Sequence, residues 1–207
     1  MRLGVPPVPQ GKQPWSREMP LMTICILVAA VAMFFSWSAS ETQAGGRLAA
    51  PFLEEKTPTT APYAFVKLCV NAPRECRPKG GVSRTQLNRK VERALEAVNT
   101  GVNQAIAPGS DAKGNDTWRL SPKSGDCEDY AVTKRKKLID RGLPPRSIRL
   151  AMATTPSGEA HVVVIVKTPK ADLVLDNRND EIKPVDKVDL NWLMIESADN
   201  PKRWRWL

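Results

Sequence analysis

One long stretch in the middle of the chain carries apolar residues at helical spacing. These residues recur every three or four positions, at Leu87, Val91, Leu95, Val98, Val102 and Ile106. Charged side chains take the other faces, so the pattern predicts an amphipathic helix that packs its apolar stripe on a core. Ser83 or Thr85 is the expected N-cap, and Pro108 followed by Gly109 ends the helix.

The last third of the chain has a different pattern. A second helix is expected from Cys127 to about Arg141, because Gly142 stops it and the prolines that follow prevent its return. Three short β-type runs come next, at residues 148–154, 161–167 and 173–175. Helices followed by strands with short turns predict an α+β fold in which helices pack on an antiparallel sheet.

The first 44 residues differ from the rest. Residues 21–35 form an uncharged apolar run that follows three basic residues, and small residues lead from it to Ala44. This order predicts a secretory signal peptide over residues 1–44, cleaved after Ala44. The alternative is an uncleaved membrane anchor, although the run is shorter than the ~20 apolar residues of a spanning helix. Either way, we expect the remainder to be exported.

The exported part is expected to form one domain. Residues 45–62 are rich in Ala, Pro, Thr and Glu, which predicts a flexible segment ahead of a domain over residues 63–207. The exported part has 28 basic and 20 acidic residues, a net charge of +8, which suits contact with anionic envelope polymers or only aids solubility. No basic helix interleaved with aromatic residues is visible, which argues against a nucleic-acid partner.

The cysteines divide into a pair and a single thiol. Cys25 lies inside the apolar run and is removed with the signal peptide. Cys69 and Cys76 flank Pro73 in a turn-like segment and are the expected disulfide. Cys127 is then a single thiol in an oxidising compartment. It is either a buried inert cysteine or a nucleophile, and the cysteine count does not separate the two.

The position of Cys127 favours a nucleophile. At a helix start, amide dipoles favour a thiolate and free N–H groups can bind an oxyanion. The base that such a thiol needs is His161, the only histidine of the sequence, which begins a β-type run. Asp176 ends the next strand, so on neighbouring antiparallel strands it can lie beside His161 and orient the ring. The order predicts a triad of Cys127, His161 and Asp176.

The sequence around these residues resembles a known family. The segment GDCEDYAVTKRKKLIDRGLPP, followed by EAHVVVIV and LVLDN, is similar to the bacterial transglutaminase-like cysteine peptidases of the LapG type. The resemblance extends over roughly residues 63–206. It implies a transglutaminase-like (papain-like) fold and places the catalytic triad on Cys127, His161 and Asp176.

The resemblance also implies a function. Members of this kind are periplasmic proteases, and the characterised ones need calcium and cleave a surface adhesin near its N-terminus. It therefore implies a periplasmic cysteine endopeptidase that hydrolyses a peptide bond in a cell-surface or periplasmic protein. A large surface adhesin, a role in biofilms and an inner-membrane regulatory receptor belong to the same expectation. An uncleaved anchor would instead hold the enzyme on the membrane, facing the periplasm. No organic cofactor is expected.

Acidic residues beside the thiol give the implied calcium a physical reason. Asp126, Glu128 and Asp129 surround Cys127 with negative charge, which raises the thiol pKa and opposes activation. A hard cation on carboxylate oxygens cancels that charge. By resemblance, Asp126 and Glu128 are the expected calcium ligands. The alternative is that these carboxylates only stabilise the helix start.

Two other function classes fit the same features. Acyl transfer to an amine, or hydrolysis of cell-wall peptides, would use the same fold and triad. A non-catalytic binding module would leave Cys127 no more reactive than an ordinary thiol. The basic run at residues 134–137 is expected to be a solvated helix face, whichever function holds.

Overall fold

The computed structural model describes residues 51–112 and 115–207. They belong to one compact unit over residues 45–207. The predicted signal peptide at residues 1–44 lies outside the described residues. In the part of the chain that the structure describes, no helix is long and apolar enough to cross a membrane.

A seven-stranded sheet lies at the centre of the fold, and every pairing in it is antiparallel. Its order is β1-β9-β8-β4-β5-β6-β7. The strands are β1 (Pro58–Thr60), β4 (Ile148–Thr154), β5 (Ala160–Lys167), β6 (Asp172–Leu175), β7 (Lys183–Pro184), β8 (Asn191–Glu196) and β9 (Arg203–Trp206). The three predicted strands are β4, β5 and β6, and the α+β prediction is confirmed.

The register of the central strands decides where the polar residues at their ends lie. β5 pairs with β4 and β6, and it is buried along almost its whole length, as its Val and Ile content predicts. Val164 of β5 lies opposite Leu175, the last residue of β6. His161 and Asp176 therefore emerge at the same end of the sheet.

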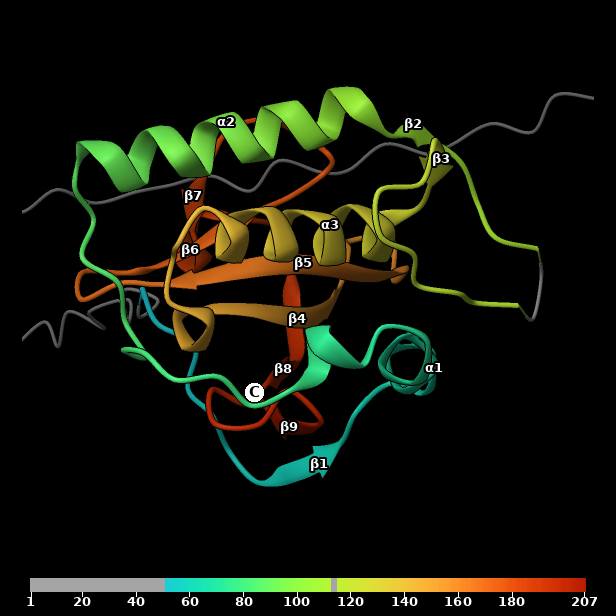
Figure 1. Ribbon diagram of the computed structural model, residues 1–207, viewed down its shortest axis with the longest axis horizontal. Coiled ribbons are helices and arrows are strands. Elements are labelled where there is room, and N and C mark those ends of the chain that lie inside the picture. Colours follow the sequence, from blue (N-terminus) through green and yellow to red (C-terminus); the bar gives the residue numbers. More distant parts are fainter. Residues whose placement is uncertain (1–50, 113–114) are drawn as a thin grey trace, which may run out of the picture. The chain divides into compact units, whose positions relative to one another are not determined.

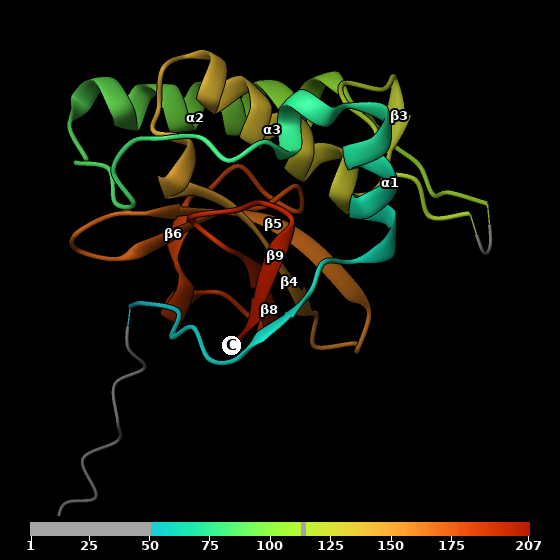
Figure 2. The ribbon, with the colours of Figure 1, turned by 60° about the horizontal axis from the view of Figure 1, so that its bottom comes forward.

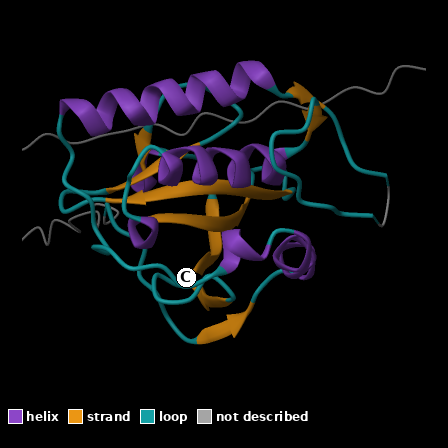
Figure 3. Ribbon diagram, viewed as in Figure 1, coloured by secondary structure: helices purple, strands orange, loops and turns teal. Residues whose placement is uncertain are grey.

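The helices cover one face of this sheet (Figure 2). They are α1 (Tyr63–Asn71), α2 (Arg89–Ala105) and α3 (Cys127–Asp140). α3 packs on β5 and β4, and α2 packs on α3, so α3 is enclosed between a helix and the sheet (Figures 1 and 3). The remaining elements are the short parallel pair β2 (Ala107–Pro108) and β3 (Ser124–Gly125), and the 3₁₀ turns η1 (Pro73–Cys76), η2 (Pro145–Ser147) and η3 (Val185–Lys187).

α3 follows its sequence signals closely, whereas α2 does not begin where they indicate. Gly142 ends α3 in the left-handed region, at φ 87°. The N-cap of α2 is Asn88, whose side chain accepts hydrogen bonds from the backbone N–H groups of Lys90 and Val91. The predicted caps Ser83 and Thr85 are wrong. The Thr85 N–H instead donates to the Lys167 carbonyl, so tertiary contact with β5 decides where the helix starts.

Residues 51–62 are part of the domain. β1 pairs with β9 at the edge of the sheet, and the Lys56 N–H donates to the Trp206 carbonyl at 2.8 Å. The Leu53 N–H donates to the Asp172 carboxylate at 2.8 Å. The predicted flexible segment at residues 45–62 is therefore wrong for residues 51–62. Composition alone does not show that a distant strand offers unpaired backbone groups.

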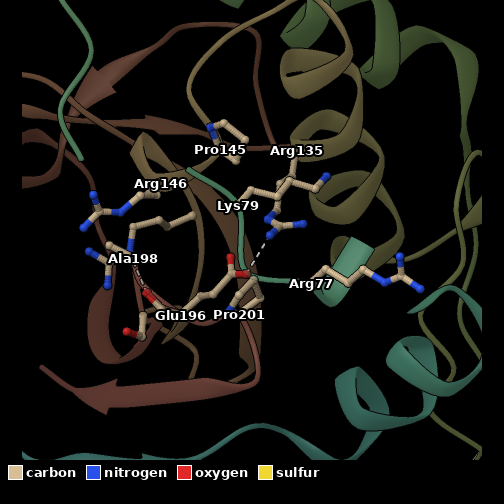
Figure 4. A pocket seen from close by; sticks show the side chains of 10 residues that line it. Arg77, Lys79, Arg135, Pro145, Arg146, Glu196, Ala198 and Pro201 are labelled. Atoms are coloured by element: carbon tan, nitrogen blue, oxygen red, sulfur yellow. Dashed lines mark hydrogen bonds and ion pairs between the residues drawn. The ribbon is translucent and has the colours of Figure 1, made fainter. Parts of the chain in front are cut away.

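The basic run on α3 is not a solvated face. Lys134 and Arg135 are buried because α3 lies between α2 and the sheet. Arg135 forms an ion pair with the buried Glu196 of β8 at 2.7 Å, and Glu196 also accepts a hydrogen bond from the Leu150 N–H. Figure 4 shows this ion pair in the lining of a pocket, to which Arg77 and Arg146 also contribute.

The expected disulfide is present. Cys69 of α1 is bonded to Cys76 of η1, and both residues belong to the hydrophobic core. Phe65 of α1 contacts Trp118 and Trp204 in the same core, with ring centroids 5.5 and 5.6 Å apart. The disulfide therefore fastens the first helix to a core that the rest of the domain shares. Within the described residues, Cys127 is the cysteine outside a disulfide.

The buried ion pair generates a stability prediction. Replacing Arg135 by Met leaves the Glu196 carboxylate buried without its partner and should lower the free energy of unfolding by about 3–5 kcal/mol. The matched control is Arg146→Met, which removes the largely exposed pair with Asp199 and should cost no more than about 1 kcal/mol. Urea unfolding measures both. Equal losses in the two variants would contradict the structural role of Arg135.

Candidate active site

The segment that enters α3 fixes the position of Cys127. Asp126 is the N-cap residue and has extended backbone, so Cys127 is the first residue of the helix. A Cβ atom on Gly125 would lie 2.1 Å from an Asp129 carboxylate oxygen, so only glycine fits there. Asp129 is buried and accepts hydrogen bonds from the Arg119 N–H at 2.6 Å and from its guanidinium at 2.7 Å. Asp129 therefore ties the preceding loop to the helix start.

His161 and Asp176 meet at the end of the sheet. The His161 Nε2 atom lies 2.9 Å from Asp176 Oδ1, and both side chains are buried. Burial opposes the charge of Asp176, but hydrogen bonds from His161 and Arg178 prevail and lower its pKa to about 2. An ionised Asp176 thus engages Nε2 and leaves the other ring nitrogen, Nδ1, for a different partner.

The thiol of Cys127 lies beside the same strand. The backbone N–H of Val162, the residue after His161, lies near the Cys127 sulfur and favours its thiolate. Burial has the larger effect, and together with the charge of Glu128 it raises the pKa of Cys127 to about 12. The sulfur lies 3.3 Å from Glu128 Oε2. In this arrangement the thiol is protonated and donates to Glu128.

Three carboxylates gather next to the thiol. One oxygen from each of Asp111, Asp126 and Glu128 lies within 4.8 Å of the others. Asp126 Oδ1 is buried and has no hydrogen-bond partner among the described residues. Burial, followed by the neighbouring Asp126, raises the pKa of Glu128 to about 8. Hard oxygen donors, an unpartnered buried oxygen and mutual repulsion together fit a Ca²⁺ site, with further ligands needed to complete it.

The sequence pattern missed Asp111. This residue lies in the loop after α2, and its backbone N–H donates to Asp126 Oδ2 at 3.2 Å. Its own carboxylate accepts hydrogen bonds from the Thr117 N–H and the Arg119 guanidinium. The parallel pairing of β2 with β3 holds the two ends of this loop together, and no local spacing in the sequence signals that pairing.

Two asparagines on α2 hold the loop that carries Asp176. The Asn103 side-chain amide lies 3.2 Å from the Asp176 carbonyl and 2.7 Å from Asp180 Oδ1. The Asn99 amide donates to the Asp180 carbonyl at 3.0 Å. The apolar stripe of α2 predicts only core packing. The polar positions of α2 have a second role, because Asn99 and Asn103 hydrogen-bond to the loop after β6.

Lys134 of α3 lies near the charged residues of this loop. It is fully buried, and within the described part of the chain its Nζ atom has no hydrogen-bond partner. Burial lowers the pKa of Lys134 to about 7, against the opposing charges of Asp176 and Asp180. The site therefore holds a buried lysine that is poorly compensated when charged.

The chain is similar to known proteins in sequence and in structure. Residues 55–207 match the profile of a family described as bacterial transglutaminase-like cysteine proteinase. No curated protein sequence matches the chain. Among solved structures, calcium-bound Legionella pneumophila LapG is 26% identical, with a TM-score of 0.50, over 60% of this chain and 71% of that one.

Two other structures of the same Legionella protein are similar to the chain. One is 26% identical with a TM-score of 0.49, over 60% of this chain and 71% of that one. An EGTA-treated form is 27% identical with a TM-score of 0.46, over 55% and 65%. The profile match and the calcium-bound structure support a transglutaminase-like fold for the three helices and the sheet.

The buried lysine predicts a specific pH dependence. Because the folded-state pKa of Lys134 lies below that of an unfolded lysine, the unfolded state binds a proton first as pH falls from about 10 to about 7, and the protein loses stability over that range. Lys134→Met should therefore be more stable than the parent below pH 7, by on the order of 3 kcal/mol, and the difference should shrink as pH rises. Urea unfolding at several pH values checks this. A difference that does not change with pH would contradict it.

Proposed function

Because the chain belongs to the bacterial transglutaminase-like cysteine proteinase family, and is therefore a cysteine peptidase, we propose that it is an endopeptidase that works through Cys127, His161 and Asp176. The observation that carries the proposal is the 2.9 Å hydrogen bond between His161 and Asp176, formed beside the strand segment whose Val162 N–H contacts the Cys127 sulfur. This arrangement supports Cys127 as the nucleophile, His161 as its base and Asp176 as the orienting carboxylate.

Each residue has a defined role in peptide hydrolysis. Asp176 holds Nε2 of His161, so Nδ1 is the nitrogen that takes the Cys127 proton. The thiolate attacks the peptide carbonyl carbon, and N–H groups at the start of α3 stabilise the oxyanion. The imidazolium gives its proton to the leaving amine, and a water molecule, deprotonated by His161, hydrolyses the thioester.

Glu128 sets the condition under which this chemistry begins. While Glu128 accepts the hydrogen bond of the Cys127 thiol, that thiol does not donate to His161. We propose Asp111, Asp126 and Glu128 as ligands of Ca²⁺, which supplies positive charge to these carboxylates when bound. If Glu128 held Ca²⁺ together with its acidic neighbours, the thiol would lose Glu128 as its hydrogen-bond acceptor. Less negative charge would then oppose ionisation of the thiol.

The proposed substrate is a protein outside the cytoplasm. The resemblance to LapG-type peptidases supports a large surface adhesin as the substrate, an inner-membrane receptor as the regulator and a role in biofilms. The predicted export signal supports a periplasmic location. Hydrolysis is proposed over acyl transfer, because the family is one of proteinases.

Cleavage of peptides tests the mechanism. With calcium present, the parent protein should cleave members of a proteome-derived peptide library, and Cys127→Ala should cleave none, because it lacks the nucleophile. Asp176→Asn should lower kcat by ~10²–10⁴-fold, because the imidazole loses its orienting acceptor. Mass spectrometry in ¹⁸O-water identifies new carboxyl ends and separates hydrolysis from acyl transfer. Cys127→Ala with full activity and an unchanged melting temperature would contradict the mechanism.

Thermal unfolding tests the calcium site without any substrate. Calcium should raise the melting temperature of the parent protein, because a ligand that binds only the folded state stabilises it. Asp111→Asn should weaken this effect and require at least ~10-fold more calcium. The matched control is Asp116→Asn, an exposed carboxylate of the same loop, which should leave the effect unchanged. A calcium effect that survives in Asp111→Asn, or none in the parent, would contradict the ligand set.

A further inference from the structure

The carboxylate of Asp176 is held at both oxygens, and only one contact is with His161. Oδ1 accepts from the backbone N–H of Arg178 at 2.9 Å as well as lying 2.9 Å from His161 Nε2. Oδ2 accepts from Arg178 Nε at 2.8 Å. Arg178, two residues after Asp176 in the same loop, thus donates to the Asp176 carboxylate from both its main chain and its side chain.

The guanidinium of Arg178 is held in turn by a second carboxylate. Arg178 Nη2 lies 2.7 Å from Asp189 Oδ1, and Nη1 lies 3.4 Å from Asp189 Oδ2. Asp176 is buried, whereas Asp189 is largely exposed. The result is a chain of alternating charge that runs from His161 through Asp176 and Arg178 to solvent at Asp189.

Two features distinguish this contact from an ordinary surface ion pair. The carboxylate that Arg178 meets is buried, so the charge of Arg178 is screened less than it would be in water. The contact also involves Oδ2, the oxygen that His161 leaves free. With both oxygens engaged, the carboxylate cannot turn about its Cβ–Cγ bond away from the imidazole without losing a charge-assisted hydrogen bond.

We propose that Arg178 is a positioning residue for Asp176: it fixes the carboxylate in the orientation that serves His161 and, by sharing the charge of that carboxylate, makes the His161 imidazolium more acidic. The proposal rests on the proposed catalytic role of His161 and Asp176. A histidine that must take and release a proton in each cycle works best when neither form is strongly favoured. Asp176 alone would favour the protonated ring.

Other charges also face this carboxylate. His161 of β5 contacts Asp176 directly. Lys134 of α3 is buried, which lowers its pKa, and the charges of Asp176 and Asp180 act to raise that pKa. Asp189 lies behind Arg178. Removing the charge of Arg178 and removing the charge of Asp189 must therefore move the His161 titration in opposite directions. A loosened structure would not do this.

The single histidine of the chain allows a direct experiment. In tag-free full-length protein labelled with ¹⁵N-histidine, the ring nitrogens report the His161 titration by NMR without assignment. In Arg178→Gln the midpoint should rise by ~0.5–1 pH unit, because a positive charge near the imidazolium is lost. Arg178→Lys should restore the midpoint in part, because it keeps the charge but not the fork of donors. Asp189→Asn should lower the midpoint.

Arg146 provides the control for the loss of a guanidinium charge. Arg146→Gln, which removes a guanidinium paired with Asp199 elsewhere on the domain, should leave the midpoint unchanged. An unchanged midpoint in Arg178→Gln, or shifts of the same sign in Arg178→Gln and Asp189→Asn, would overturn the proposal. If Arg178→Gln does not fold, the exposed Asp189→Asn still decides it: a lowered midpoint supports the proposal and any other result overturns it.

The experiment separates this proposal from the proposed function. The titration needs no thiol and no substrate, so it is repeated in a Cys127→Ala background with the same expected shifts. If the parent cleaves no peptide but the midpoints move as expected, the proposed function fails and the charge coupling stands. If the parent is active, Arg178→Gln should lower kcat about 10-fold with KM little changed, and Arg178→Lys should recover part of it. A change in KM alone would overturn the positioning role.

Discussion

Enclosure of α3 between α2 and the sheet is the constraint on which the rest of the structure depends. The helix carries charged residues at buried positions, and each buried polar group must find a partner or change its protonation. Arg135 forms an ion pair with Glu196, and Asp129 forms one with Arg119. Lys134 has no hydrogen-bond partner in the described residues, and burial lowers its pKa. The same enclosure places Cys127, the first residue of the helix, beside β5.

This enclosure explains why the site has opposing tendencies. The helix start and the Val162 N–H favour a thiolate, whereas burial and Glu128 favour a thiol, and the latter prevail. Peptidases of this chemistry need the thiolate. The carboxylates that oppose ionisation are also those that fit a hard cation. Activity under this account depends on the charge state of the acidic cluster as much as on the triad.

The sequence predicts those parts of the fold that local patterns specify. The Val-rich run of β5, the helix begun by Cys127 and the stop at Gly142 are visible from composition and spacing. The same patterns single out Cys127, His161 and Asp176, the residues of the proposed triad. Asp111 was missed because its role arises where two loops meet, and Arg178 because its contact with Asp176 depends on how the loop after β6 folds back on itself. The edge strand β1 was missed for a similar reason, since its partner β9 lies about 145 residues away in sequence. The basic run of α3 shows that charge alone does not predict exposure.

The reactivity of Cys127 tests the central claim most directly. The rate of alkylation by iodoacetamide at neutral pH, mapped to Cys127 by mass spectrometry, compares the parent protein with His161→Gln in the presence of calcium. The account predicts that the parent reacts at least ~10-fold faster, because in the proposed mechanism His161 is the base that takes the thiol proton. Equal rates in the two proteins would show that His161 does not activate Cys127 and would contradict the proposed triad.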